Sequence, residues 1–162
     1  MVRTHSCVFF VVASFAACSS DNELSPGPGT FDPAYATSSS YITRMSGPVL
    51  GTSPHKEVQI WYSANIDPAL DDDSLTAPVG TVAVKTANMD DQPGIDAIVV
   101  MVKKEKGYDS ANGDWYYDMR TPAGAIMNDD KGNPVSGKVA MCINCHQGFK
   151  TTDYLGGTKL RK

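Results

Sequence analysis

Two stretches in the middle of the chain carry strand patterns. In 57–63 (EVQIWYS) polar and apolar residues alternate, so that Val58, Ile60 and Tyr62 share one face. The stretch 79–87 is rich in β-branched residues, which favour strands over helices. Both stretches are therefore predicted to be strands.

Two further strands are predicted on either side of a turn. The stretch 95–102 is an almost unbroken apolar run, which is typical of a central strand that is covered on both faces. The pair Asn112-Gly113 is a strong hairpin signal, and it directly precedes DWYYDM at 114–119. These last two strands are therefore expected to pair in antiparallel orientation.

The remaining segments predict only short helices. Sparse apolar positions in 32–45 suggest a first helix, and 65–73 has room for one helical turn. The stretch 128–137 is rich in turn residues, and a short helix is expected after it. The predicted fold is α+β: an antiparallel β-sheet of about four to five strands with a few short helices, one of them at the C-terminus.

The N-terminus has the composition of an export signal. Arg3 and His5 precede an apolar run, and small residues come directly before Cys18. The run is far shorter than the roughly 20 apolar residues that a membrane-spanning helix needs. The sequence therefore predicts a signal peptide at 1–17. The residues FAAC at 15–18 resemble a bacterial lipobox, which would make Cys18 a lipidated residue; the alternative is ordinary cleavage nearby, which would release a soluble periplasmic or secreted protein.

The rest of the chain divides into a tether and one domain. Residues 18–31 begin with Cys18, the candidate for lipidation. The rest of this segment is rich in Ser, Pro and Gly and predicts a flexible tether. Residues 32–162 have the size of one ordinary domain. A formal net charge of −4 argues against nucleic acid as a partner and provides no basic patch for lipid headgroups. The expected location is the periplasm, with membrane contact only through the lipid anchor.

Five residues near the C-terminus, CINCH at 142–146, form the attachment sequence of c-type haem. The thiols of Cys142 and Cys145 add to the vinyl groups of the porphyrin, and the imidazole of His146 binds the iron on the proximal face. A bare Cys-x-x-Cys would leave zinc or a redox disulfide open, but the following His and the export signal favour haem. The prediction is one covalently bound haem c per chain.

The other cysteines and histidines do not compete with this motif. Cys7 would leave with the signal peptide and Cys18 would carry the lipid, so no pair is left for a structural disulfide. His55 is the only other imidazole after the signal peptide. A Cys/His zinc site needs four ligands and would leave none for haem, so zinc is not expected.

The strand-rich middle separates this chain from the helical classes of c-type cytochrome. Mitochondrial-type electron carriers have the motif near the N-terminus and an axial Met downstream, whereas no Met follows His146 here. A four-helix cytochrome c′ has a late motif, but the predicted strands cannot form such a bundle. The haem is therefore expected to lie against a sheet.

Over about 53–155 the chain resembles the small β-sheet cytochromes that include cytochrome P-460 and cytochrome c′-beta. The resemblance rests on the segments SPHKEVQIWYS, VGTVAVK, IVVMVKK, DWYY, CINCH and TDYL, in this order. It implies a homodimer of antiparallel-sheet domains, each with a five-coordinate haem whose sixth position is open. It also implies small nitrogen compounds, hydroxylamine and nitric oxide, as ligands or substrates, and a soluble cytochrome as electron acceptor.

The resemblance also singles out Lys85. In VGTVAVK it matches the lysine that, in the hydroxylamine-oxidising members, is bonded to a meso carbon of the porphyrin. Strand alternation would place Lys85 on the face of Val79, Thr81 and Ala83, whose small side chains would let a flat ring approach. Lys85 is therefore the candidate catalytic residue and a candidate contact of the haem; the alternative is a solvent-facing strand lysine.

The sequence does not assign a distal base. Asp114 and Asp118 flank an aromatic cluster, but alternation does not tell which of them faces the iron. The arginine that some active relatives carry in the second strand corresponds to Gln59. His55 is either a sixth iron ligand or a structural residue before an edge strand. The aromatic residues that could wall a haem pocket, or belong to the core, are Trp61, Trp115, Tyr116 and Tyr117.

Three functions remain open at this point. The first is an enzyme that oxidises hydroxylamine, nitric oxide or both through a lysine-cross-linked haem. The second is a module that binds nitric oxide without turnover, and the third is an electron-transfer cytochrome with a filled sixth position. Lys85 favours the first, the missing distal base leaves the second open, and the missing second ligand disfavours the third.

Overall fold

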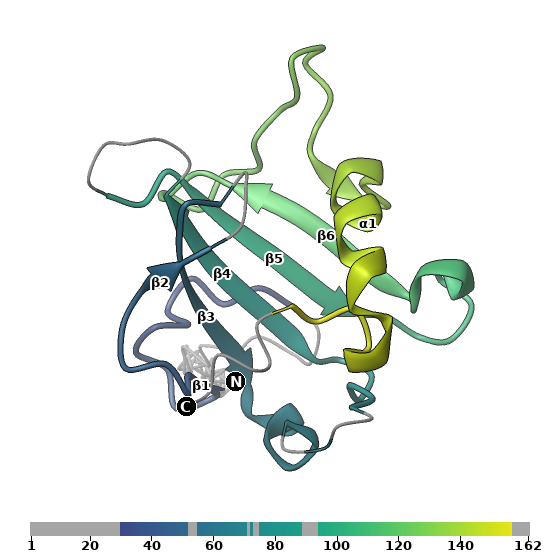
Figure 1. Cartoon of the computed structure of the whole chain (residues 1–162). Coiled ribbons are helices and arrows are strands. Elements are labelled where there is room, and N and C mark those ends of the chain that lie inside the picture. The colour runs from purple at the N-terminus through teal and green to yellow at the C-terminus, as the bar shows by residue number, and fades with distance from the viewer. Residues whose placement is uncertain (1–29, 52–54, 71, 73–74, 89–93, 157–162) are drawn as a thin grey trace, which may run out of the picture.

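A computed structural model describes residues 30–51, 55–70, 72, 75–88 and 94–156 of the chain. The predicted signal peptide, Cys18 and most of the predicted tether lie outside these residues. Within them, one seven-stranded sheet forms the centre of the molecule (Figure 1). The strands run in the order β1-β3-β4-β5-β6-β7, β2 also pairs with β3, and all pairs are antiparallel.

The four predicted strands are confirmed as the long strands of this sheet, and three strands of two residues join them. The strands are β1 (Tyr41–Ile42), β2 (Val49–Leu50), β3 (Glu57–Ser63), β4 (Val82–Asn88), β5 (Ala97–Lys103), β6 (Trp115–Arg120) and β7 (Ser136–Gly137). The prediction of four to five strands was too low. Pairs as short as β1, β2 and β7 show no periodicity in the sequence, so the hydrophobic pattern could not reveal them.

Helices are few, as predicted. They are the 3₁₀ helices η1 (Ala64–Ala69), η2 (Ser110–Asn112) and η3 (Gln147–Thr152), and the α-helix α1 (Ala140–His146), which carries the Cys-x-x-Cys-His motif. The predicted turn at 65–73 corresponds to η1. No helix in the described residues is long and apolar enough to cross a membrane.

The predicted helix at 32–45 is wrong. This segment forms turns that lead into β1, and its polar side chains bind its own backbone: Asp32 Oδ1 accepts from the amide of Ala34 at 2.8 Å, and Ser38 Oγ accepts from the amide of Ser40 at 3.2 Å. Such local bonds compete with helical hydrogen bonds. Tyr35 instead packs edge-on against Trp61 of β3, with ring centroids 5.1 Å apart.

Both faces of the sheet are covered, as the apolar run of β5 predicted. On one face, the N-terminal segment packs Phe31, Tyr35 and Tyr41 against a cluster that contains Val84 and Val100. On the other face, η1 and α1 pack against a second cluster. The buried members of that cluster from the sheet are Ile60, Tyr62, Ala83, Met101, Trp115 and Tyr117. Figure 1 shows α1 on this second face, which we call the helix face.

The β5–β6 connection is longer than the hairpin signal suggested. Although β5 and β6 pair antiparallel as predicted, the connection spans 104–114 and contains η2. Gly113 (φ 71°) and Asp114 (φ 57°) adopt left-handed conformations directly before β6. A Cβ on Gly113 would clash with the ring of Tyr154, so the C-terminal segment packs closely against this turn.

The η1 segment should contribute strongly to stability through Leu70, which is 1% exposed in the cluster of the helix face. We expect Leu70→Ala to lower the free energy of unfolding by about 2–5 kcal/mol, because it removes buried methyl groups and leaves a cavity. Leu50, which is 87% exposed, is the matched control, and Leu50→Ala should stay within about 0.5 kcal/mol of wild type. Urea denaturation checks both, and equal effects would contradict this packing.

Candidate haem site

The helix α1 presents the three motif side chains together. Cys142, Cys145 and His146 are three and four residues apart, a spacing that places side chains on one helical face. Cys142 is half-buried and packs against the core of the helix face, whereas Cys145 is exposed. Both are free thiols. Burial raises the pKa of the Cys142 thiol to about 11, so this residue is a neutral thiol at neutral pH.

His146 is held by the chain that follows it. Its Nδ1 lies 2.6 Å from the backbone carbonyl oxygen of Tyr154. A carbonyl oxygen only accepts hydrogen bonds, so Nδ1 must carry the proton and Nε2 keeps a free lone pair. Burial lowers the pKa of His146, which also favours the neutral ring. A neutral imidazole with Nδ1–H bound to a carbonyl is the usual form of a metal-binding histidine.

Two aromatic rings fix the imidazole of His146 from its sides. Tyr117 of β6 and Phe149 of η3 both meet it edge-on, with ring centroids at 5.5 Å and 5.9 Å respectively. Among the described residues, the buried hydroxyl of Tyr117 has no hydrogen-bond partner. Burial raises the pKa of Tyr117, so the hydroxyl stays protonated and is a potential donor beside His146.

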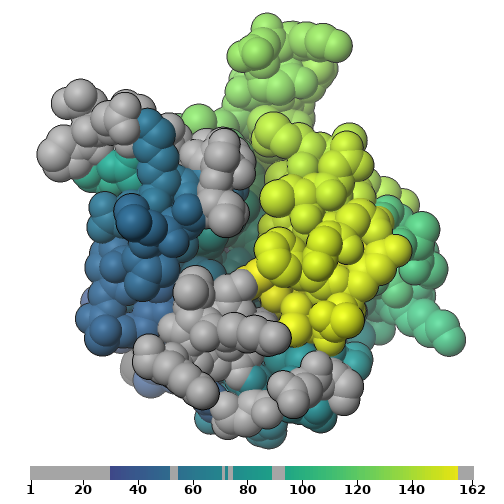
Figure 2. Space-filling model, in the orientation of Figure 1, coloured from purple at the N-terminus to yellow at the C-terminus, as the bar shows by residue number. Residues whose placement is uncertain are grey.

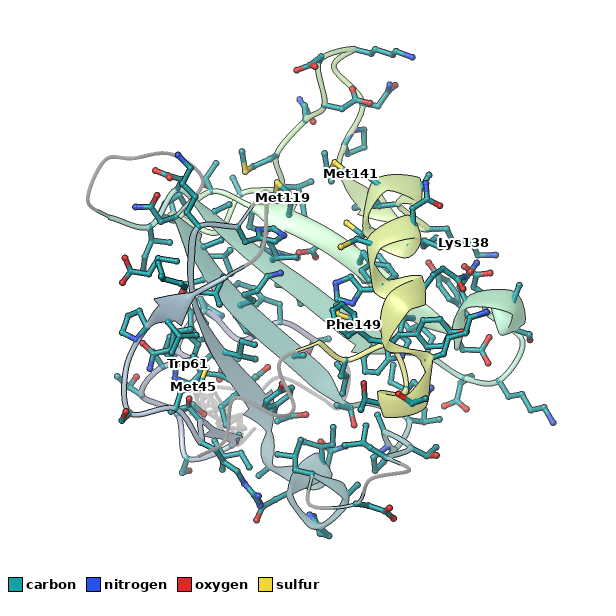
Figure 3. All side chains as sticks on the ribbon, viewed as in Figure 1. Met45, Trp61, Met119, Lys138, Met141 and Phe149 are labelled. Atoms are coloured by element: carbon teal, nitrogen blue, oxygen red, sulfur yellow. The ribbon has the colours of Figure 1, made fainter. Side chains whose placement is uncertain are left out.

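Lys85 lies on the same face of the sheet as α1. It sits in β4 between Ile60 of β3 and Val99 of β5, and the row continues to Met119 of β6, which Figure 3 labels near the end of that strand. Burial lowers the pKa of Lys85, and the thiols of Cys142 and Cys145 partly oppose this effect. The lysine therefore lies close enough to the motif to interact with its thiols electrostatically, and its burial on the helix face favours the neutral amine.

The surroundings of Lys85 differ in part from the sequence prediction. Val79 precedes β4 and is exposed, so it does not share the lysine's surroundings. Ala83 does share its face, and so does Ala87, which is paired with Ala97 of β5. Small side chains therefore do flank Lys85, but at the positions two before and two after it.

His55 is the second imidazole near this group. Its Nδ1 is buried and has no partner among the described residues. Burial, followed by the nearby Lys85 and His146, lowers the pKa of His55 to about 4. His55, Lys85 and His146 thus come from three distant parts of the sequence and lie close enough to influence one another electrostatically.

The two candidate acids do not belong to this group. Asp118 points to the opposite face, where Arg120 binds it with contacts of 2.9 and 2.7 Å. Asp114 lies in the turn before β6, and its Oδ1 accepts from the backbone amide of Asp109 at 2.7 Å. Gln59 also faces away from Lys85, since it alternates with Ile60 along β3.

The four aromatic candidates divide between the faces. Trp115 and Tyr117 belong to the cluster of the helix face, whereas Trp61 and Tyr116 pack in the cluster of the opposite face. Trp61 and Tyr116 are therefore partly buried residues that pack against the core on the side away from α1. Of the four, only Tyr117 has a ring contact with His146 among the described residues.

A furrow runs beside α1. The space-filling view shows it between the yellow C-terminal segment and the blue strands (Figure 2). A separate hollow of about 340 Å³ lies beside the paired strands β3 and β4, and its lining includes Pro48, Gln59, Thr86 and Ile95 but no His or Cys. In the part of the chain that the structure describes, no cluster of three or more His, Cys, Asp or Glu side chains could hold a metal ion by itself.

Sequence reasoning missed the residues that hold the imidazole of His146. These are Tyr154, through its carbonyl, and its neighbour Asp153, whose carboxylate binds Lys103 of β5. In the sequence, TDYL at 152–155 stands out only as one of the segments that carry the family resemblance. Asp153 is of a type that tolerates the left-handed region, but Tyr154 is not, so the sequence does not indicate two consecutive left-handed residues here.

No protein-family model matches this chain, and a search among curated proteins found no match either.

The lowered pKa of His55 predicts a pH dependence of stability. The unfolded chain takes up this proton near the ordinary 6.5 and the folded haem-free chain only near 4, so stability should fall as the pH drops from about 6.5 to 4. NMR titration of the imidazole should give a pKa well below 6.5. In urea denaturation, His55→Gln should show a shallower loss of stability over this window, and identical slopes for both proteins would contradict the prediction.

Proposed function

We propose that this chain is a periplasmic mono-haem c-type protein. In this proposal Cys142 and Cys145 attach the haem and His146 is the proximal ligand of its iron. The observation that carries the proposal is the hydrogen bond from Nδ1 of His146 to the Tyr154 carbonyl, because it leaves Nε2 free for a metal. Two free thiols on the same short helix complete the attachment motif.

The helix face suits a porphyrin in composition. It offers apolar side chains from β3 to β6, and the alanines beside Lys85 leave room for a flat ring. A bound haem would supply one-electron chemistry and a position for a small ligand on its iron. The protein's own contribution would be to fix the proximal imidazole, to keep the surroundings apolar and to bring Lys85 to the ring.

We further propose that Lys85 is bonded to the haem and that the protein oxidises hydroxylamine, nitric oxide or both. Burial supports this role, since the lowered pKa of Lys85 increases the neutral amine, which is the nucleophilic form. Lys85 would supply the amine for this bond. Replacing its N–H and a ring C–H by an N–C bond would release two electrons and two protons, and a peroxide would be the oxidant that takes them up as it is reduced to water. In turnover, electrons would leave to a soluble acceptor cytochrome and protons to solvent.

Two alternative functions each rest on one observation. Binding of nitric oxide without turnover is favoured by the positions of Asp114 and Asp118, neither of which supplies a carboxylate beside Lys85. Electron transfer is favoured by His55, whose unpartnered Nδ1 near Lys85 and His146 could fill the sixth position. The proposed homodimer and the lipid anchor at Cys18 are compatible with all three functions.

The optical spectrum of the exported protein tests haem binding and separates the three functions. Wild type, produced with a working haem-maturation system, should carry covalent haem, and Cys142→Ser/Cys145→Ser should lose it, as denaturing electrophoresis with haem staining will show. A red-shifted, broadened reduced Soret band would indicate the cross-link. An ordinary high-spin ferrous spectrum would favour gas binding, and sharp low-spin bands in both oxidation states would favour electron transfer.

The role of Lys85 is tested by its replacement. Lys85→Ala should abolish hydroxylamine oxidation and restore an ordinary reduced spectrum, because the amine that forms the bond is gone, while nitric oxide should still bind. The matched control is Lys106→Ala, which removes an exposed lysine from the β5–β6 connection and should behave as wild type. A Lys85→Ala protein that oxidises hydroxylamine at the wild-type rate would remove the cross-link from the mechanism.

A further inference from the structure

The two residues directly after η3 form a left-handed turn. Asp153 (φ 48°) and Tyr154 (φ 65°) are consecutive left-handed residues, and neither is glycine. For a bulky aromatic residue such as Tyr154 this conformation is unusual, so the surroundings must impose it. We call residues 147–155 the C-terminal strap.

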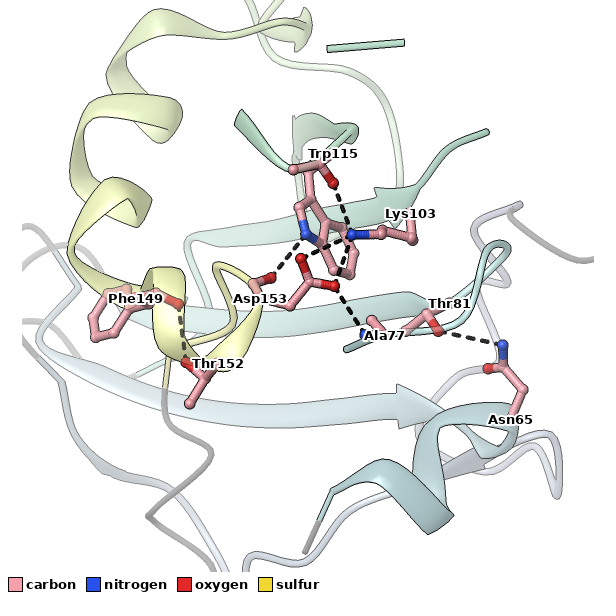
Figure 4. Close-up of polar contacts among 9 residues, drawn as sticks. Asn65, Ala77, Thr81, Lys103, Trp115, Phe149, Thr152 and Asp153 are labelled. Atoms are coloured by element: carbon pink, nitrogen blue, oxygen red, sulfur yellow. Dashed lines mark hydrogen bonds and ion pairs between the residues drawn. The ribbon is translucent and has the colours of Figure 1, made fainter. Parts of the chain in front are cut away.

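The carboxylate of Asp153 ties the strap to the sheet (Figure 4). Lys103 Nζ of β5 donates to both carboxylate oxygens at 2.8 and 2.7 Å, and the backbone amide of Ala77 donates to Oδ2 at 2.8 Å. The two charged side chains are only 12% and 11% exposed. The carbonyl of Asp153 also accepts from Trp115 Nε1 at 2.8 Å.

The same contacts determine where Tyr154 lies. Lys103 Nζ also donates to the carbonyl of Gly113 at 2.8 Å, which links the strap to the turn before β6. The ring of Tyr154 packs on Gly113, and its hydroxyl donates to the carbonyl of Ala111 at 3.3 Å. With side chain and preceding residue both fixed, the Tyr154 carbonyl faces Nδ1 of His146.

We propose that the buried Asp153–Lys103 ion pair is a positioning device for the imidazole of His146. The pair acts through Tyr154: it holds the left-handed turn, the turn directs the carbonyl, and the carbonyl fixes the tautomer and orientation of the ring. Desolvation offsets much of the attraction within a buried ion pair, so such a pair is weak evidence for stability, and we assign this one a geometric role instead. The inference rests on the proposed function in that His146 is taken as the ligand of the haem iron.

The test compares graded changes at Asp153. Asp153→Ala removes all contacts of the carboxylate, whereas Asp153→Asn keeps its shape and tolerates a left-handed backbone but loses the charge. In the reduced haem-loaded protein, a weaker Nδ1–H···O bond makes the imidazole a poorer donor. The iron–imidazole band in the resonance Raman spectrum should therefore shift to lower frequency, further in the Ala variant than in the Asn variant. If the sixth position is filled, faster exchange of the His146 Nδ1 proton by NMR replaces this readout.

One control outside the strap and one change at the partner of Asp153 isolate the ion pair. Asp67→Asn breaks another ion pair, with Arg44 at 2.5 Å, at a more exposed carboxylate outside the strap, and should leave the band in place. Lys103→Met removes the other partner of the ion pair and should shift the band in the same direction as Asp153→Asn. These two variants together test the proposal if Asp153→Ala fails to fold. Thermal melting establishes that each variant is folded. Folded Asp153 variants with the wild-type band, or an equal shift in Asp67→Asn, would overturn the proposal.

Failure of the proposed function would give a different result. In that case the wild-type chain would carry no covalent haem, and the strap would be tested in the haem-free full-length chain. The Nδ1 proton of His146 should then exchange faster with solvent in Asp153→Ala than in wild type. Equal exchange rates would overturn the role of the ion pair independently of any cofactor.

Discussion

The burial of β5 on both faces is the constraint on which the rest of the structure depends. An apolar central strand requires a cover on each side of the sheet, and the two covers here are unlike each other. The N-terminal segment covers one face with aromatic rings. The other face is covered by η1 and by α1, which is only seven residues long. So short a helix covers only part of this face, and a furrow is left beside it (Figure 2). Lys85 belongs to the same face of the sheet.

The apolar helix face also sets the chemical state of the groups that it holds. Burial is the first cause of the lowered pKa values of His55, Lys85 and His146, and of the raised pKa of Cys142. Every one of these shifts favours the uncharged form. An uncharged amine is a nucleophile and an uncharged imidazole can bind a metal, so one physical cause would suit these residues to the different roles that we propose for them. The acidic residue of β6 is kept apart from these groups, since Asp118 is paired with Arg120 on the opposite face.

Much of this arrangement could be predicted from the sequence, and the reasons for the misses are specific. The long strands have clear hydrophobic patterns, and the motif of α1 is a local signal. The 32–45 segment was misjudged because side-chain to backbone bonds, such as that of Asp32, compete with a helix. The partners of His146 could not be found by any local rule. The contact of Lys103 with Asp153 joins residues 50 positions apart, and it exists only once the sheet has formed.

The late position of the strap has a consequence for the order of assembly. A helix of seven residues without a side-chain cap is marginal by itself, so the motif would remain pliable until the strap, which includes η3, docks. Docking depends on contacts across 50 residues to Lys103 and 38 to Trp115, and such distant contacts form late. If haem is attached as we propose, the thiols of Cys142 and Cys145 would thus stay accessible for attachment while the sheet is already forming. Closure of the strap would then complete the proximal side as the final step of folding.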